Sequence, residues 1–384
     1  GLDMLKLKGS WGTLGNQNLD KPYPAEPLLS NAYSAVFGTP SAIYPGYQLS
    51  YLPNPNLRWE KVEAWEVGAE ANFFRNRLHF EGVYYKKTTK NLLAEVPGIS
   101  GTVPGIGNLG SIENKGVELA LNWRDQIGDW GYNIGGNLTT IKNKVLSLVQ
   151  EGYSIIAGDK SQSYTMAGYP IGYFYGYKVE GIYQTQEEIN SSPKNTLATV
   201  TPGDLKFVDV NGDGEITKGD ETVDNPGDRK IIGNSTPRFH YGITGNISWK
   251  NFDLNIFFQG IAKRDVWISD NVFWGGSGTA GNWEMYNNSW TPEHTDAKYP
   301  MYAGRISSIQ QTGYLFNGAY LRLKTLALGY TLPREWTNKV KLSTVRLSLS
   351  GYNLFEISQI PDLYDPDQIS SSYPMMRSVA FGLQ

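Results

Sequence analysis

The chain has 384 residues, no cysteine and a formal net charge of -3 at neutral pH. It is long enough to bury a large core without disulfides. No cluster of lysine and arginine stands out, which argues against nucleic acid as a partner because such binding needs a concentrated positive surface. No run of 18 apolar residues occurs, but this test detects only helical membrane spans, since barrel strands alternate apolar and polar residues.

The dominant pattern along the chain has a period of two residues, which is typical of strands with one apolar face. In residues 65–73, for example, tryptophan, valine, alanine and phenylalanine alternate with glutamate, glycine and asparagine. The pattern predicts about eleven strands. In chain order they are residues 3–11, 65–73, 77–87, 116–123, 130–141, 172–184, 239–249, 252–258, 320–331, 343–353 and 377–384.

The connections between these strands differ in length. Short polar turns such as RNR (75–77) and RDQIGD (124–129) alternate with much longer connections. Outer-membrane barrels have short periplasmic turns and long outer loops. The long connections are residues 12–57, 88–114, 185–237 and 261–319.

Aromatic residues at the strand ends also favour a barrel. Trp130, Tyr132, Trp249 and Phe252 stand next to turns, where barrels carry an aromatic girdle at the lipid boundary. A soluble sandwich would show the same alternation, so periodicity alone leaves both folds open. With the strands given above, inner turns and outer loops do not alternate consistently along the chain. We therefore predict a further strand between residues 142 and 236.

Residues 204–220 contain the stretch DVNGDGEITKGD, which is typical of a calcium loop inserted in a long connection. Oxygen ligands at positions 1, 3, 5, 7 and 12 of such a frame converge on one ion, and the glycine at position 6 permits the sharp turn. The last position holds the shorter aspartate and no flanking helices are evident, so we expect structural Ca²⁺, or Mg²⁺, of modest affinity. The predicted ligands are Asp209, Asn211, Asp213, Glu215 and Asp220. The alternative is an Asx-rich turn without an ion.

The connection 261–319 is rich in aromatic residues that could stack on sugar rings or peptide side chains. Loops of this length in a compact domain are usually functional. The candidate substrate residues are Trp267, Trp274, Trp283, Tyr286 and Trp290. An equally good interpretation is that they form a small core within the loop.

Catalytic motifs are not evident. His79, His240 and His294 lie far apart in the sequence, and no cysteine nucleophile, phosphate-binding glycine motif or GxSxG elbow occurs. Pairs of acidic residues are too common here to indicate a glycosidase. We therefore do not expect an enzyme.

Several stretches, in order along the chain, resemble the SusC/RagA family of TonB-dependent outer-membrane transporters. They are NPNLRWEKVEAWEVGAE, GSIENKGVELALNW, GYPIGYFYGYKVEGIYQT, GDLKFVDVNGDGEIT, IIGNSTPRFHYGI, WTPEHTDAKYP, YLRLKTLALGYTLP and GYNLFEISQIPDLYDPD. Any one of them would be a weak signal, whereas the ordered set is specific.

The resemblance implies an all-β fold, in which residues 1–384 form the C-terminal part of a 22-stranded transmembrane barrel. It also implies a plug domain and first strands that this chain does not contain, so the chain is expected to be part of a longer polypeptide. The ending RSVAFGLQ lacks the usual terminal aromatic, and we expect a few further residues.

The function implied by the resemblance is import of an oligosaccharide or oligopeptide through the outer membrane. The implied partners are a SusD-like surface lipoprotein and the TonB complex. A competing hypothesis is a secreted calcium-binding β-sandwich that binds glycans. A third is a complete 12-stranded channel, against which the long ordered match argues.

Overall fold

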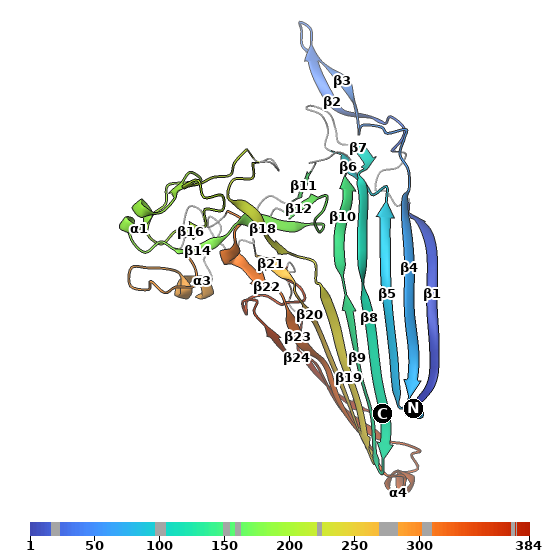
Figure 1. Cartoon of the computed structure of the whole chain (residues 1–384). Coiled ribbons are helices and arrows are strands. Elements are labelled where there is room, and N and C mark those ends of the chain that lie inside the picture. Colours follow the sequence, from blue (N-terminus) through green and yellow to red (C-terminus); the bar gives the residue numbers. More distant parts are fainter. Residues whose placement is uncertain are drawn as a thin grey trace.

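In the computed structural model, one large antiparallel sheet forms the body of the molecule (Figure 1). The structure describes residues 1–16, 24–96, 105–148, 154–157, 163–220, 225–268, 283–301, 309–369, 373 and 375–384. Ten strands lie side by side in an order that follows the chain. They are β1 (Leu2–Asn16), β4 (Glu60–Phe73), β5 (Leu78–Lys90), β8 (Gly110–Ile127), β9 (Trp130–Thr140), β19 (Phe239–Trp249), β20 (Phe252–Ala262), β23 (Tyr320–Thr331), β24 (Arg346–Ser358) and β25 (Ser378–Leu383).

One face of this sheet is apolar and uncovered. The exposed fractions of Leu7, Leu121 and Leu349 are 78%, 51% and 52%. No second sheet packs on this face in the described part of the chain, so the sandwich hypothesis is wrong. An apolar face left open over many strands suits lipid as its surroundings. The strands β1 and β25 are the two edges of the sheet, and within the described residues they do not pair with each other.

The short turns and the long connections lie at opposite ends of the sheet, as predicted. The helix α4 (Arg334–Thr337) and both termini lie at the short-turn end (Figure 1). At this end aromatic rings stack across neighbouring strands: ring centroids are 5.4 Å apart for Trp130 and Trp249, 6.1 Å for Trp249 and Phe252, and 4.5 Å for Phe252 and Tyr330. The predicted aromatic row at the strand ends is therefore present, and its place at a lipid boundary stays a prediction.

Two predictions about the middle of the chain are wrong. Residues 172–184 do not cross with the main sheet but form β13 (Tyr173–Tyr177) and β14 (Val179–Ile182) in small separate sheets. No additional crossing strand lies between residues 142 and 236 in the described segments, because β9 pairs directly with β19. The strand β10 (Lys142–Leu148) merely continues β9 along β8. The alternating residues of 172–184 reflect burial within the outer loops. Once this segment is left out of the main sheet, the short turns and long loops alternate consistently.

The long connections build a second region at the opposite end, shown above and to the left of the sheet in Figure 1. No helix in the described residues is long and apolar enough to cross a membrane. The remaining strands are β2 (Leu29–Phe37), β3 (Ala42–Leu49), β6 (Leu93–Val96), β7 (Gly105–Asn108), β11 (Ser154–Ala157), β12 (Ser163–Met166), β15 (Lys194–Asn195), β16 (Leu205–Phe207), β17 (Glu215–Ile216), β18 (Arg229–Asn234), β21 (Asp265–Trp267) and β22 (Leu315–Asn317). The other helices are α1 (Gln186–Ser191) and α3 (Trp283–Asn288), with short 3-10 turns at Thr312–Tyr314 and Asn338–Val340.

The buried apolar clusters belong to these loops rather than to the sheet. One cluster joins three different connections and contains Phe174, Val266, Trp267, Ile268, Met285, Tyr299, Tyr314, Phe316 and Ile360. A smaller one contains Tyr177, Leu205, Phe207 and Ile216. The loops therefore have a core of their own and can hold side chains in fixed positions above the sheet.

Candidate functional site

A buried arginine connects the sheet to the outer loops. Arg322 lies on β23 and is 1% exposed. Its guanidinium nitrogens lie 2.8 Å from Asp365, 3.0 Å from Asp367 and 3.7 Å from Glu356. The register pairs Arg322 with Glu356 and Gln259, which places it on the polar face, the face that lines the interior of a barrel. Residues 359–369 are thereby held against that interior face.

The charges of this network hold each other in place. Burial alone would raise the pKa of Asp365, but hydrogen bonds from Arg322 and from the backbone amides of Asp367 and Met375 outweigh burial and lower it. Lys324 adds an ion pair of 3.1 Å to Asp367, and the hydroxyl of Tyr320 donates to the same carboxylate. Buried charges need such partners, because an unpaired one carries a large desolvation penalty.

The sequence analysis did not identify this network. Two sequence features belong to this network: the alternation in YLRLK, which directs arginine and lysine to one face, and the DPD stretch at residues 365–367. Nothing in the sequence shows that these two segments meet.

Of the predicted substrate aromatics, two are buried. Trp267 is 6% exposed and packs edge-on against Tyr314, with ring centroids 6.3 Å apart. Trp290 is also 6% exposed, and its indole Nε1 donates to Gln184 at 2.9 Å. These two side chains stabilise the loops and offer little surface to a ligand. Trp274 lies outside the described residues.

The other two aromatics are exposed side by side on α3. Trp283 is 76% and Tyr286 69% exposed, and their rings meet edge to face at 5.7 Å. Beside them is a hollow of about 610 Å³. It is lined by Trp283, Glu284, Lys298 and residues 358–363. Residues 358–363 lead directly into the segment that Arg322 holds through Asp365 and Asp367. The buried network therefore positions one wall of the hollow.

The hollow also presents opposite charges. Lys298 lies 3.2 Å from the Glu284 carboxylate, which also accepts a hydrogen bond of 3.2 Å from the Tyr299 hydroxyl. Burial lowers the pKa of Lys298, but the interactions with Tyr299 and Glu284 outweigh it and leave the pKa raised. Aromatic rings next to a fixed cation and carboxylate can stack on apolar ring faces and hydrogen-bond polar groups.

The predicted metal loop folds into consecutive turns. The Asp209 carboxylate accepts hydrogen bonds from the amides of Gly212 at 2.6 Å and Gly214 at 2.9 Å, and the first of the causes that lower its pKa is the bond from Gly214. Asn211 and Asp213 accept from the amides two residues further on. Both glycines have positive φ, 76° and 86°, which glycine tolerates without strain.

The Glu215 side chain and the Asp220 backbone make other contacts. The Glu215 carboxylate lies 3.4 Å from Lys194, and the Asp220 amide donates to the Asn225 carbonyl at 3.1 Å. The buried Asp228 closes the loop by accepting from the amides of Val210 and Thr217. In the described residues, no three acidic or histidine side chains are arranged to hold a metal.

Comparisons with known proteins agree with the fold. Residues 3–354 match the family described as TonB dependent receptor-like, beta-barrel. The chain is 33% identical to TonB-dependent receptor P3 of Formosa agariphila over 98% of its own length and 39% of that protein. It is 25% identical to TonB-dependent receptor SusC of Bacteroides thetaiotaomicron, covering all of this chain and 37% of SusC.

Among solved structures, the RagAB peptide transporter superposes on the whole chain and on 41% of its matching chain, with a TM-score of 0.78 and 24% identity. The chain thus spans about two fifths of the length of the relatives it matches.

Proposed function

The chain belongs to the TonB-dependent receptor-like β-barrel family of the outer membrane, a family of transporters rather than enzymes, and we propose that it forms the C-terminal barrel portion of an importer. The cargo is a nutrient oligomer, an oligosaccharide or an oligopeptide. Import is driven through the TonB complex, and a SusD-like surface lipoprotein covers the loop end.

The observation that carries this proposal is the position of the exposed aromatic pair. Trp283 and Tyr286 lie at the long-loop end, beside a hollow whose wall is anchored to the interior face of the sheet by Arg322. A ligand bound there would touch two outer loops and the end of β24. Similarity to the TonB-dependent receptor SusC and to the RagAB peptide transporter supports the two partners, and the second also supports a peptide cargo. The oligosaccharide alternative rests on the sequence resemblance.

The test uses the full-length polypeptide in its native outer membrane, together with any lipoprotein that co-purifies. Uptake of labelled oligosaccharides and oligopeptides is measured for the wild type, for Trp283→Ala with Tyr286→Ala, and for Trp336→Ala. Trp336 is a matched control because it is 57% exposed on α4, at the other end of the sheet. We expect severalfold weaker uptake of one cargo class in the double variant only. Wild-type uptake that is unchanged when TonB is removed would overturn the proposal.

We also propose that the loop 209–220 binds Ca²⁺, or Mg²⁺, in a structural role. Its support is the calcium-loop spacing of Asp209, Asn211 and Asp213, whose side chains hold the loop in consecutive turns around two glycines. Asp228 already fastens the loop, so the ion would add rigidity rather than create the fold.

Hydrogen exchange of residues 209–220 with Ca²⁺ and with a chelator tests this second proposal. We expect protection by Ca²⁺ at millimolar or lower concentration, and its loss in Asp209→Asn with Asp213→Asn. Asp296→Asn, at a carboxylate that is 95% exposed, is the control. Equal exchange under both conditions would leave the Asx-turn interpretation instead.

A further inference from the structure

A row of lysines crosses three neighbouring strands on the outward face of the sheet. Register pairs Trp65 with Lys86, Lys86 with Lys115, and Lys115 with Lys142. Directly paired residues share a face, so these lysines lie on the same face as Trp65. That face is the apolar one, and the row lies immediately beyond the contact between Trp65 and Tyr84, whose rings are 5.5 Å apart.

This row carries more positive than negative charge. Like charges placed directly opposite each other destabilise a sheet. The Glu113 carboxylate lies 2.9 Å from both Lys86 and Lys115 and offsets part of the repulsion. Register places Lys144 directly opposite Glu113, but neither Lys142 nor Lys144 forms an ion pair among the described residues.

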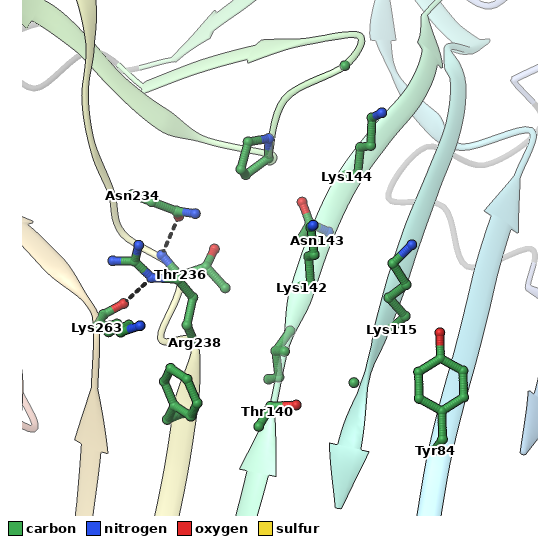
Figure 2. A pocket seen from close by; sticks show the side chains of 15 residues that line it. Tyr84, Lys115, Thr140, Lys142, Asn143, Lys144, Asn234, Thr236, Arg238 and Lys263 are labelled. Atoms are coloured by element: carbon green, nitrogen blue, oxygen red, sulfur yellow. Dashed lines mark hydrogen bonds between the residues drawn. The ribbon is translucent and has the colours of Figure 1, made fainter. Parts of the chain in front are cut away.

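Beside the row is a hollow of about 720 Å³ between β8, β10 and the start of β19 (Figure 2). Figure 2 shows Lys115, Lys142 and Lys144 on one side, and Asn234, Arg238 and Lys263 on the other. No aspartate or glutamate is among the residues that line it. The lining residues are Tyr84, Lys115, Gly116, Thr140, Ile141, Lys142, Asn143, Lys144, Gly168, Pro170, Asn234, Thr236, Arg238, Phe239 and Lys263.

The cations on the far side of the hollow are already oriented. Arg238 lies 3.3 Å from Asp265, and the Lys263 ammonium lies 5.2 Å from the ring centroid of Phe239. Lys142 and Lys144 lie on the opposite side of the hollow from these two cations (Figure 2). An anion entering between them would meet Lys142 and Lys144, which form no ion pair among the described residues, whereas Lys115 and Arg238 are already paired with Glu113 and Asp265.

The lower part of the hollow identifies the kind of anion. Tyr84 and Phe239 line it, and both belong to the apolar face that lies against lipid. A soluble cargo would instead travel along the opposite face, inside the barrel. A ligand with an acidic head and hydrocarbon chains fits an opening that is basic above and apolar below.

We propose that this hollow binds the phosphate of an anionic lipid of the outer leaflet, with its acyl chains against the apolar face below. The inference depends on the family's outer-membrane location and not on the cargo or on transport itself. Loss of uptake in other experiments would therefore leave it standing.

The experiment is native mass spectrometry of the full-length protein in detergent, titrated with phosphatidylglycerol, with lipopolysaccharide and with zwitterionic phosphatidylethanolamine. The test variant is Lys142→Gln with Lys144→Gln. The control is Lys194→Gln with Lys230→Gln, which removes the same charge from the outer loops, where both side chains are exposed. Heat modifiability on gels verifies that every variant is folded.

We expect the wild type and the control to retain an anionic lipid, and the test variant to bind it at least about tenfold more weakly, since each lysine near a membrane surface contributes to such binding. Equal retention by the test variant, or equal binding of phosphatidylethanolamine, would overturn the proposal. Binding of inorganic phosphate that displaces the lipid at similar concentration would also overturn it and indicate a site for soluble anions.

Discussion

The sheet leaves many of its apolar side chains exposed, whereas the outer loops bury theirs. On the sheet, Leu7 and Leu121 are 78% and 51% exposed, and the strands are joined by long uninterrupted ladders. In the loops, Trp267 and Ile268 are 6% and 2% exposed and the strands are short. The difference follows from the surroundings: a membrane accepts apolar side chains, whereas loops in water have to bury them.

The largest expected effect is on the link between the two regions. Arg322→Ala leaves Asp365, Asp367 and Glu356 without their buried partner, which should cost about 3–5 kcal/mol. The loss should appear as faster hydrogen exchange in residues 359–369, with the barrel strands unchanged. Arg377→Ala, at a 63% exposed side chain that pairs with the same Glu356, is the control. Unchanged exchange in Arg322→Ala would show that the network does not hold the segment.

Truncation within the loop core should have the next largest effect. Ile268→Ala removes a side chain that is 2% exposed and should destabilise the outer loops by about 2–5 kcal/mol. Limited proteolysis at increasing temperature would report cleavage in the loops before the barrel. The matched change Leu349→Ala, on the outward face of β24, should leave loop cleavage as in the wild type. Equal sensitivity of both variants would contradict the separation of the two regions.

A charge placed on the sheet tests which face meets lipid. Leu121→Arg puts a cation on the apolar face and should cost about 2–4 kcal/mol near the bilayer midplane. Asn122→Arg, one residue along β8 on the polar face, should cost much less. Folding titrations of the full-length protein into lipid vesicles measure the difference. Similar costs for the two substitutions would mean that the faces are assigned incorrectly.

The smallest expected effect is a dependence on pH. Because the pKa of Asp365 is lowered in the folded state, its contribution to stability is complete above the unfolded value of about 3.9 and is lost as pH falls through the lowered pKa. Docking of residues 359–369 should therefore be constant from neutral pH to about pH 5 and weaken below about pH 4. Hydrogen exchange at stepped pH checks this. Asp365→Asn should remove the acid step, and a loss already complete above pH 5 would assign it to another group.

Most of the main sheet could be predicted from sequence. Strand alternation and turn lengths located all ten of its strands and its two unlike ends, because each strand's pattern is set by the lipid and water on its two faces. β24 was predicted too early and too short, as residues 343–353 against Arg346–Ser358 in the structure. Residues 172–184 were wrongly predicted to cross with the main sheet. Tyr173 and Phe174 are both buried, and local alternation does not show in which sheet a strand lies.

The candidate site was only partly predictable. Five aromatics in one connection were equally good ligand candidates in the sequence, yet Trp267 and Trp290 are buried while Trp283 and Tyr286 are exposed. Which of these aromatics are buried depends on how three connections pack together, and no local sequence pattern shows this. The same reason explains why Arg322 and Asp365, 43 positions apart in the numbering, were not recognised as partners.

By itself, then, the sequence determined the family, the crossing strands and the apolar face, because these depend on residues close together in the chain. Only the tertiary structure decided which loop aromatics are exposed, which charges are buried and which lysines stand in one row. Those properties arise when strands and loops distant in sequence come into contact, and the register of that contact is set by the whole sheet.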